Sequence, residues 1–482
     1  MRLQQSKENL LTSITRESFY EFVIEFWDTV VAEEPIYNWH IEYLCNELQE
    51  VAERVFRGER KKHDLIINVA PGTTKSTIAS VMFPAWVWTR YPQSRFICGS
   101  FTQDLALDLS VRSRKVIGSE KYQKSFPMEM SKQYDGKERF DNIKGGSRLS
   151  TSVGGSVIGL HSHFLIIDDP LNPQGARSEA DLKSANYWMT ETLPFRKVDK
   201  MIAVTILIMQ RLHQMDPTGD WLDRTRGKGI KHICLPAELV PDENGKPLYL
   251  NPTELAENYV DGLFDPVRMP REFLEEVKTE PYRYAGQFLQ HPVPLGGGMF
   301  EVGKIDLRED APLKMVRRIR SWDKAGTQDG GNYSVGVLMG LDKRGCYWIL
   351  DVVRGQWGAT NREAMILQTA QLDGHDVEIE LEIEGGSGGK ESGENTVRML
   401  AGFTVHVQHP TGDKPSRAYA FASQVGAGNV HCLLRPWTRD FIEEHRYFDK
   451  GRYDDQVDAA SGAFNRLAKK VRIIGAISLR QR

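Results

Sequence analysis

The first half of this chain is built around the stretch Leu65-Ile66-Ile67-Asn68-Val69-Ala70-Pro71-Gly72-Thr73-Thr74-Lys75-Ser76-Thr77. Its apolar, β-branched start is typical of a buried strand in a parallel sheet, and Pro71-Gly72 ends that strand. A segment able to form a helix follows from Ser76. Strand, tight loop, Lys-Ser and helix together predict a phosphate-binding P-loop. In such a loop, backbone N–H groups surround the phosphates, the Lys75 ammonium meets the β/γ oxygens and the Ser76 hydroxyl holds Mg²⁺.

The loop departs from the usual P-loop template at two positions. With Lys75 and Ser76 in the template's Lys-Ser/Thr places, the two template glycines would fall on Val69 and Thr74, and the loop's own glycine is Gly72. An ordinary strand–turn–helix with a surface lysine is the alternative for this stretch alone. The expected ATP-binding residues of the loop are Pro71, Gly72, Thr73, Thr74, Lys75, Ser76 and Thr77.

Two helices are predicted before the loop, over residues 16–57, from apolar residues at helical spacing. Trp39 and His40 lie at the start of the second helix. An aromatic side chain just ahead of a P-loop can stack on adenine, and a polar one can read the edge of the base. Trp39 and His40 are therefore further candidate ATP contacts, with packing in the core as the alternative.

A second informative stretch is His163-Phe164-Leu165-Ile166-Ile167-Asp168-Asp169-Pro170. Four apolar residues followed by two carboxylates predict a buried strand that ends in acids at its C-terminal edge, where open α/β sheets bind ligands. Asp168 is expected to hold Mg²⁺, and Asp169 to orient or deprotonate the attacking water. Together with the P-loop, this strand predicts a nucleotide hydrolase.

Three other features belong to the same domain. The apolar strand 201–209 ends in Gln210, a candidate sensor that couples hydrolysis to movement. A helix from about Thr102 carries Arg112 and Arg114, candidate arginine fingers toward ATP on a neighbouring subunit, or else part of a solvated helix face. Segments 139–144 and 147–153 flank Gly145-Gly146 and predict a β-hairpin.

The last third of the chain predicts a different sheet. A strand ends in Asp323, antiparallel strands follow over 334–341 and 346–353, a helix fits 362–372, and strand 377–383 leads into Glu384. A terminal helix opens with Asp454, Asp455 and Asp458, of which two can share one helical face. Acids in this order predict an RNase H-like nuclease, in which carboxylates hold two Mg²⁺ or Mn²⁺ ions about 4 Å apart. Scattered surface acids are the alternative.

Composition narrows the setting. The formal net charge is −3 over 482 residues, so any DNA contact is expected to be local, salt-sensitive and of low sequence specificity. The five cysteines form no CxxC pair, which argues against a zinc site or a disulfide framework. The sequence starts without a signal-peptide pattern and has no run long enough to span a membrane. We therefore expect a soluble, intracellular protein.

The combination resembles the large terminase subunit of tailed bacteriophages, from about Trp39 to Asn465. Its most specific motifs are Gly154-Gly155-Ser156-Val157-Ile158-Gly159, Tyr284-Ala285-Gly286-Gln287-Phe288-Leu289-Gln290-His291-Pro292 and Asp454-Asp455-Gln456-Val457-Asp458-Ala459. The resemblance implies an ATP-driven motor that packages double-stranded DNA into a procapsid and cuts the concatemer. It also implies a ring, pentameric in the family, that forms in the host cytoplasm and docks transiently on the portal protein, with a small terminase subunit as partner.

The same resemblance implies roles for individual residues. Lys75 and Ser76 would serve phosphate and Mg²⁺, and Asp168 would serve Mg²⁺. The nuclease metals would be bound by Asp323, Glu384 and the group Asp454, Asp455 and Asp458, with Asp323, Glu384 and Asp455 as catalytic residues. The family's usual catalytic residue after the strand aspartate is Glu, whereas this chain has Asp169, with Glu179 as an alternative acid. Gln210 stands where a Ser or Thr is common.

The predicted fold is therefore α/β, with a P-loop ATPase domain of the ASCE type around a mainly parallel sheet and an RNase H-like nuclease domain after it. The expected divisions are an N-terminal helical region (1–60), the ATPase domain (61–215), a linker subdomain (216–300) and the nuclease domain with a basic tail (301–482). A P-loop helicase or translocase is one rival. A catalytically silent prophage remnant that binds the portal is another.

Overall fold

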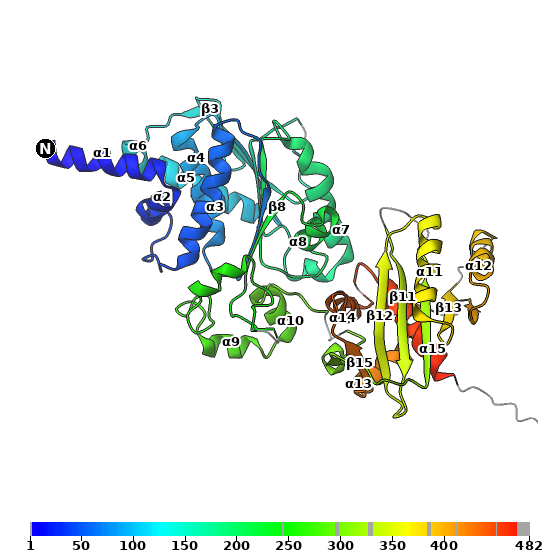
Figure 1. The fold of residues 1–482 in the computed structure, drawn as a ribbon. Helices are drawn as coiled ribbons and strands as arrows, with labels where there is room; N and C mark the ends of the chain where they lie inside the picture. Colours follow the sequence, from blue (N-terminus) through cyan, green and yellow to red (C-terminus); the bar gives the residue numbers. More distant parts are fainter. Residues whose placement is uncertain are drawn as a thin grey trace, which may run out of the picture. The chain divides into compact units, whose positions relative to one another are not determined.

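The structure, a computed structural model, describes residues 2–157, 159–242, 245–294, 298–325, 331–382, 387–409, 413–449 and 451–469. The chain divides into two compact units, Met1–Val293 and Pro294–Arg482, each of which is described by itself (Figure 1). Both units combine a sheet with covering helices, which confirms the predicted α/β class. Residues 216–293, expected to form part of a linker subdomain, belong to the first compact unit.

The described part of the N-terminal unit contains an eight-stranded sheet in the order β3-β4-β5-β2-β6-β7-β1-β8. The strands from β5 to β8 run parallel, and β4 pairs antiparallel with β5 through the hairpin expected at Gly145-Gly146. Strand β7 lies between the P-loop strand and the acidic strand. The strands are β1 (Asp64–Val69), β2 (Arg95–Ser100), β3 (Met130–Asp135), β4 (Arg139–Asn142), β5 (Ser147–Ser152), β6 (Phe164–Asp168), β7 (Val204–Met209) and β8 (Ile230–Leu235).

The central strands of this sheet are buried on both faces, as their continuous apolar runs predict. Successive side chains of a strand point to opposite faces, so Leu65 and Ile67 join one core and Ile66 joins the other. In Figure 1, α3 (Trp39–Phe56), α4 (Phe83–Arg90) and α5 (Gln103–Gly118) lie on one side of the sheet, and α7 (Glu179–Tyr187) and α8 (Pro217–Thr225) lie on the other. This layering leaves the C-terminal edge of the parallel strands to the connecting loops.

Several helix starts follow from their first residues. Thr102 caps α5 by accepting the N–H of Leu105, and Asn38 accepts the N–H of Trp39 at the start of α3. The other helical segments of this unit are α1 (Arg2–Glu17), α2 (Phe19–Phe26), η1 (Trp27–Thr29), η2 (Thr77–Met82), α6 (Glu120–Ser125), η3 (Gly175–Arg177), η4 (Trp188–Thr192), η5 (Leu193–Arg196), η6 (Thr253–Asn258), α9 (Arg271–Val277), α10 (Pro281–Arg283) and η7 (Tyr284–Phe288).

The described part of the C-terminal unit contains a seven-stranded sheet in the order β14-β13-β10-β11-β12-β15-β9. The predicted antiparallel meander β10–β11–β12 is present, and β13 adds to it parallel to β10. The strands are β9 (Asp306–Arg308), β10 (Arg317–Asp323), β11 (Ser334–Leu341), β12 (Tyr347–Gly355), β13 (Glu378–Glu382), β14 (Val405–Gln408) and β15 (Val430–Leu433).

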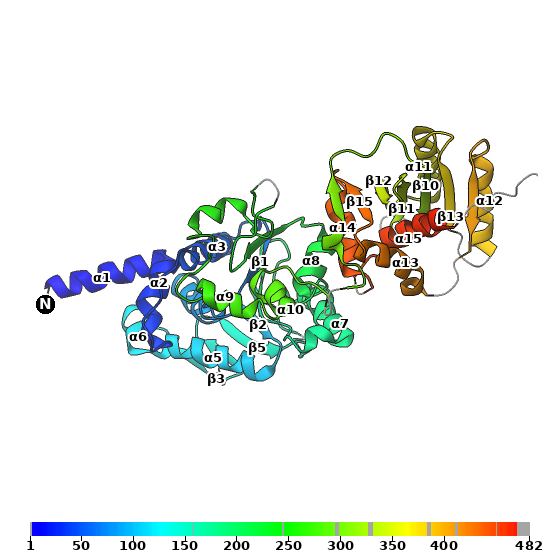
Figure 2. The ribbon, with the colours of Figure 1, turned by 90° about the horizontal axis from the view of Figure 1, so that it is seen from below.

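Helices cover both faces of this second sheet (Figure 2). One core joins α13 (Lys414–Gly426), α14 (Thr438–Tyr447) and α15 (Asp455–Ala468) to residues such as Ile319. The other joins α11 (Ala359–Asp373) and α12 (Ser387–Met399) to Trp322. A short turn, η8 (Val302–Lys304), precedes β9. Among the described residues, no helix combines the length and the apolar character needed to cross a membrane.

Candidate active sites

The P-loop connects β1 to η2 and brings Lys75 to the two acids that end β6. The Lys75 ammonium lies 3.3 Å from Oδ2 of Asp169, and the Ser76 hydroxyl donates to Oδ1 of Asp168 over 2.9 Å. Lys75 and Asp168 are both buried. The loop and the acidic strand, predicted separately, therefore meet at the C-terminal edge of the sheet.

Thr74 takes the backbone conformation of the glycine that it replaces. Its φ is +63°, in the left-handed region that is unfavourable for a β-branched residue, and Gly72 has a φ of +76°. Strain of this kind persists only where the surrounding structure imposes it, and it concentrates at functional sites. Thr74 thus adopts a left-handed conformation at the position where the P-loop template has a glycine.

Asp168 has a partner that the sequence did not indicate as functional. The Ser80 hydroxyl donates to Oδ2 of Asp168 over 2.6 Å, four residues after the Ser76 hydroxyl that bonds to the other oxygen. Burial, followed by the charge of Asp169, raises the pKa of Asp168 to about 6. The four-residue spacing of the two serines was the available signal, because residues i and i+4 share a helix face.

Asp169 lies at the mouth of the loop, with a φ of +43°. Its Oδ1 accepts the backbone N–H of Gln210 over 3.3 Å, so the end of β7 is joined directly to the candidate catalytic acid. The alternative acid, Glu179, has a side chain that is 80% exposed and is paired with Lys183. Asp169 is therefore the better placed of the two for the ATPase reaction.

His40 is not exposed to a nucleotide. Its side chain is fully buried, and Nε2 lies 3.0 Å from the carbonyl oxygen of Thr73, to which the neutral ring donates a proton. Burial lowers the pKa of His40 to about 4. The prediction that His40 contacts ATP is therefore wrong. His40 instead supports the loop through its hydrogen bond to the Thr73 carbonyl. Trp39 is half-buried against Phe264 and Tyr259.

The two candidate arginine fingers differ in their surroundings. Arg112 donates from Nη2 to the Thr77 hydroxyl over 2.9 Å and thus reaches the P-loop of its own chain. Arg114 pairs with Asp135 over 2.5 Å, and both side chains are about two-fifths exposed. The structure therefore brings Arg112, and not Arg114, to the candidate nucleotide site of the same chain.

In the C-terminal unit, Asp323 ends β10 on the face that α15 covers. The helix approaches this strand closely, since a Cβ on Gly462 would lie 2.6 Å from the Ser321 hydroxyl oxygen. Burial, followed by the charges of Asp458, Glu382 and Asp455, raises the pKa of Asp323 well above its usual range. Burial also raises the pKa of Asp455, whose Oδ2 accepts the Tyr333 N–H over 2.9 Å. The strand and helix acids expected to act together do lie together.

Glu382 is the acid of β13 in this cluster, and sequence reasoning missed it in favour of Glu384. Position 384 lies outside the described residues. Two cations from α13 complete the site: Arg417 lies 2.8 Å from Glu382 and 3.0 Å from Asp458, and Lys414 lies 2.8 Å from Asp458 and 2.7 Å from Asp454. The alternating acids of β13 were the only sequence signal for Glu382.

The acidic cluster has the chemistry of a site for a hard divalent cation, because carboxylate oxygens are the ligands that Mg²⁺ and Mn²⁺ prefer. Burial, followed by the negative charge of neighbouring carboxylates, raises the pKa of Asp323 and Asp455, and a bound cation would favour their charged forms. In the described part of the chain, no three Asp, Glu, His or Cys side chains already converge as a metal site. The side chains of Lys414 and Arg417 lie among the carboxylates instead.

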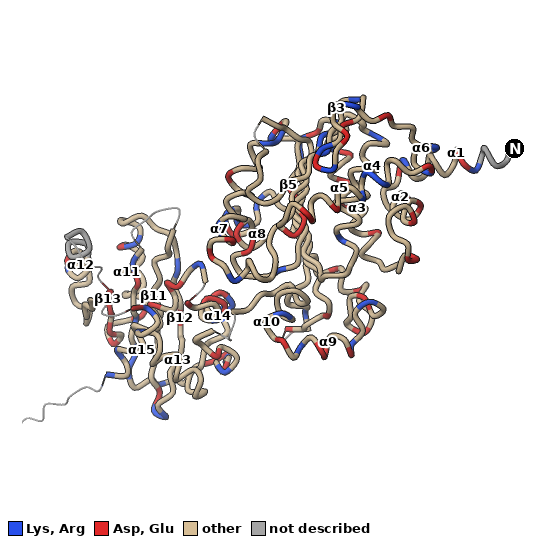
Figure 3. Tube along the Cα trace, turned by 180° about the vertical axis from the view of Figure 1, so that it is seen from behind, with Lys and Arg blue, Asp and Glu red and all other residues tan. Residues whose placement is uncertain are grey.

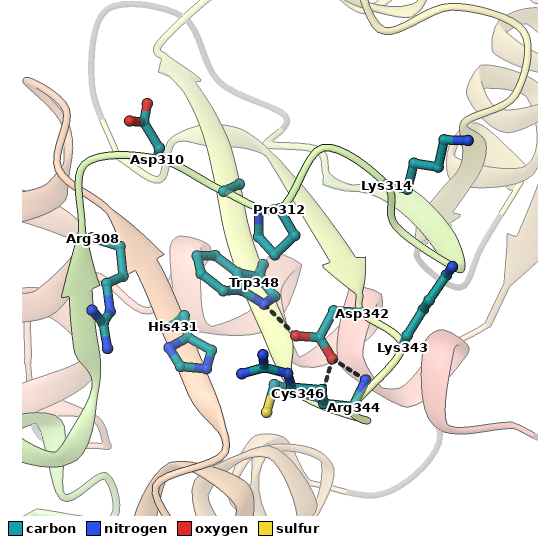
Figure 4. Close-up of a pocket in the computed structure, with 11 residues that line it drawn as sticks. Arg308, Asp310, Pro312, Lys314, Asp342, Lys343, Arg344, Cys346, Trp348 and His431 are labelled. Atoms are coloured by element: carbon teal, nitrogen blue, oxygen red, sulfur yellow. Dashed lines mark hydrogen bonds between the residues drawn. The ribbon is translucent and has the colours of Figure 1, made fainter.

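A separate cavity of about 500 Å³ in the same unit is lined by Asp342, Trp348 and His431, among others (Figure 4). Asp342 accepts the Trp348 indole N–H over 3.1 Å and the backbone N–H groups of Arg344 and Cys346. Asp342 belongs to the turn between β11 and β12. In the β10–β11 pair, Arg317 faces Leu341 at that end of the strands, whereas Asp323 faces Val335 at the other end. The turn therefore lies at the opposite end of the sheet from the acidic cluster. The cavity is therefore distinct from the candidate nuclease site.

Residues 320–467 match the family described as the terminase RNaseH-like domain. The large terminase of a thermophilic bacteriophage, in complex with ADP, has 13% identity and a TM-score of 0.30, covering 88% of this chain and 99% of that one. The large terminase nuclease of the thermophilic phage G20c with bound magnesium has 16% identity and a TM-score of 0.28, covering 36% of this chain and 98% of that one. No curated protein matches this sequence.

The matched family spans β10 to α15 and includes the whole described acidic cluster. The same chain carries, in a separate compact unit, a P-loop that meets an aspartate strand. Residues 320–467 are therefore similar to the RNaseH-like domain of terminases, and a separate compact unit of the same chain carries the candidate phosphate-binding loop.

Proposed function

We propose that this chain is the catalytic subunit of a motor that hydrolyses ATP to package double-stranded viral DNA and cuts concatemeric DNA with a metal-dependent endonuclease. The observation that carries the proposal is the presence of two separate sites. One unit holds Lys75, Asp168 and Asp169 at the end of a parallel sheet, and the other holds the cluster around Asp323.

In the ATPase unit, the residues divide the work of phosphoryl transfer between them. Lys75 would neutralise the β/γ-phosphate oxygens, and Ser76 with Asp168 would hold Mg²⁺, which offsets the charge that develops on the phosphates. Asp169 would then be released from its ion pair with Lys75 to accept a proton from the attacking water. The bond from Gln210 N–H to Asp169 would pass the change to β7, in keeping with a coupling role for Gln210.

Arg112 supports a transition-state role within one chain, because its guanidinium already reaches Thr77 at the P-loop. Arg114 remains the candidate for a finger offered to a neighbouring subunit, since its ion pair with Asp135 lies at the surface. The pentameric ring, the portal protein and the small terminase subunit are proposed from the family alone.

In the nuclease unit, the acidic cluster of Asp323, Glu382, Asp455 and Asp458 would form the site for the divalent metal, with Asp454 and Glu384 as further acids beside it. The metal supplies an activated water and stabilises the leaving 3′-oxygen of the phosphodiester. The carboxylates of the chain orient the metal, and burial beneath α15 limits competing water. Metal-dependent cutting thus draws on residues that the ATPase reaction does not use.

Double-stranded DNA is the proposed substrate and track. Figure 3 shows acidic and basic residues interspersed along the trace of each unit, and the formal net charge is −3. A monomer with this charge distribution is expected to bind DNA weakly, with low sequence specificity and with sensitivity to salt. Weak DNA binding suits a motor that must release the DNA at every step of translocation.

The test is cleavage of supercoiled plasmid in Mg²⁺ or Mn²⁺ by the wild type, Asp323→Ala and Lys75→Ala, with ATP hydrolysis measured on the same preparations. We expect Asp323→Ala to abolish cutting and spare ATPase activity, and Lys75→Ala to do the reverse. ATPase activity without cutting in any metal would favour a helicase-like translocase. The proposal would be contradicted if both variants kept both activities, or if the wild type had neither activity.

A further inference from the structure

The helix α13 brings two cations into contact with the acidic cluster of the nuclease unit. Lys414 and Arg417 are three residues apart and therefore share one face of the helix. Their side chains form four ion pairs of 3.0 Å or less with Asp454, Asp458 and Glu382. The Arg417 side chain is 14% exposed and lies inside the cluster, whereas the Lys414 side chain is 42% exposed and pairs with the cluster from its solvent-facing side.

These two side chains are held by a well-packed helix. Asp413 caps its start by accepting the Ser416 N–H, and Asn465 of α15 donates to the Arg417 carbonyl over 3.0 Å. Ala418 and Phe421, on the following turn, are buried in the core. The positions of Lys414 and Arg417 are therefore set by the fold.

The ion pairs divide the carboxylates into two groups. Both oxygens of Asp458 are engaged, Oδ1 with Arg417 and Oδ2 with Lys414. Asp323 and Asp455, by contrast, have no cation partner within 4 Å among the described residues. A divalent ion entering at Asp458 would have to break the charge-assisted bonds to Lys414 and Arg417, whereas an ion at Asp323 and Asp455 would break no ion pair.

We propose that Lys414 takes the place of one of the two divalent ions in this nuclease site, so that a single divalent ion binds, at the end formed by Asp323 and Asp455. Lys414 then supplies the second positive charge beside the scissile phosphodiester, and Arg417 holds Asp458 and Glu382 in position. The inference rests on the proposed nuclease function and deepens it, since it assigns the number of ions and the residue that replaces the other.

The test counts bound ions in the full chain. Mn²⁺ binding is titrated by calorimetry in the absence of nucleotide. An ion is assigned to the nuclease site when its binding is lost in Asp323→Asn. We expect one such ion in the wild type, two in Lys414→Met, which keeps the length of the side chain without its charge, and one in Lys414→Arg, which restores the charge. Lys343→Met, at the exposed β11–β12 turn, is the matched control and should also bind one.

The outcomes separate this inference from the nuclease proposal beneath it. Two outcomes would overturn the role of Lys414 and leave the proposed metal nuclease intact. One is that the wild type binds two Asp323-dependent ions. The other is that a folded Lys414→Met, with the melting temperature of the wild type, still binds only one. If Lys414→Met does not fold, Lys414→Gln is titrated in its place under the same criteria. No Asp323-dependent ion in any of these proteins would overturn the nuclease proposal itself.

Discussion

Lys75 and Asp169 form an ion pair across the mouth of the P-loop, with 3.3 Å between Nζ and Oδ2. The residue expected to bind phosphate and the residue expected to activate water thus neutralise each other before nucleotide binds. Phosphate oxygens would replace the carboxylate as the partner of Lys75, which frees Asp169 for its role in the reaction. In the proposed ATPase site, Asp169 would in this way become available as a base only when nucleotide is bound.

The pair predicts opposite effects of Asp169→Asn on binding and on turnover. Removing the carboxylate removes the general base, so kcat for ATP hydrolysis should fall by about 10² or more. The ATP Kd should stay equal or tighten, because Lys75 no longer has a competing partner. Fluorescent-nucleotide titration and phosphate release measure the two quantities, with Glu179→Gln on the exposed face of α7 as a control that changes neither. A Kd weakened tenfold by Asp169→Asn would contradict this account.

Arg112→Ala and Arg114→Ala form a second matched pair, on one helix and two residues apart. Arg112 contacts Thr77 of the P-loop, so its loss should lower kcat by about 10² or more if it stabilises transition-state charge. Arg114→Ala removes only a surface ion pair and should leave the ATPase rate of the isolated chain within about twofold. Equal rates in the two variants would remove Arg112 from the mechanism.

Thr74→Gly should stabilise the N-terminal unit. A β-branched residue at a φ of +63° carries about 1–2 kcal/mol of strain, of which part is offset by the greater freedom of glycine in the unfolded chain. A net gain of about 1 kcal/mol would raise the melting temperature of this unit by about 2 °C in differential scanning calorimetry. Thr73→Gly is the contrast, because it removes a buried hydroxyl that donates to the Ala70 carbonyl over 2.8 Å and should lower the melting temperature.

Glu382→Gln and Glu380→Gln separate a functional acid of β13 from a merely buried one. Glu382 pairs with Arg417 in the acidic cluster, so its neutralisation should reduce metal-dependent plasmid cleavage at least tenfold. Both carboxylate oxygens of Glu380 are buried without a hydrogen bond, its nearest cation is Arg466 at 3.6 Å from Oε2, and burial raises its pKa. Glu380→Gln should therefore keep cleavage and leave stability unchanged or improved. Full activity in Glu382→Gln would show that Glu382 is not needed for cleavage and would leave Glu384 as the candidate acid after this strand.

His40 predicts a loss of stability in mild acid. Burial lowers its pKa to about 4 in the folded protein against 6.5 in the unfolded chain, so the unfolded chain takes up the proton first as the pH falls. The stabilisation is complete above pH 6.5 and declines as the pH falls from there toward 4, with about 2 kcal/mol lost by pH 5. In His40→Gln, an amide can donate to Thr73 without titrating. Its denaturation midpoint should therefore change less between pH 7 and pH 5 than that of the wild type.

Much of the local structure could be predicted because it depends on neighbours in sequence. The apolar runs of β1, β6 and β7, the glycine pair of the β4–β5 hairpin and the Thr102 cap each contain their own signal. The order of the acids predicted an RNase H-like sheet before any contact was known. Glu382 was missed because strand alternation gives every second acid of β13 the same face, and nothing local says which one the neighbouring elements approach.

The sequence by itself determined the two sheets, the P-loop and the aspartates at the strand ends, since these follow from side-chain periodicity and turn chemistry over a few residues. Only the tertiary structure decided the partners: Ser80 with Asp168, His40 with Thr73, Arg112 with Thr77, and Lys414 with Asp458. These pairs lie 33 to 88 residues apart in the chain. Contacts at such separations depend on how whole helices and strands pack, so no local pattern encodes them.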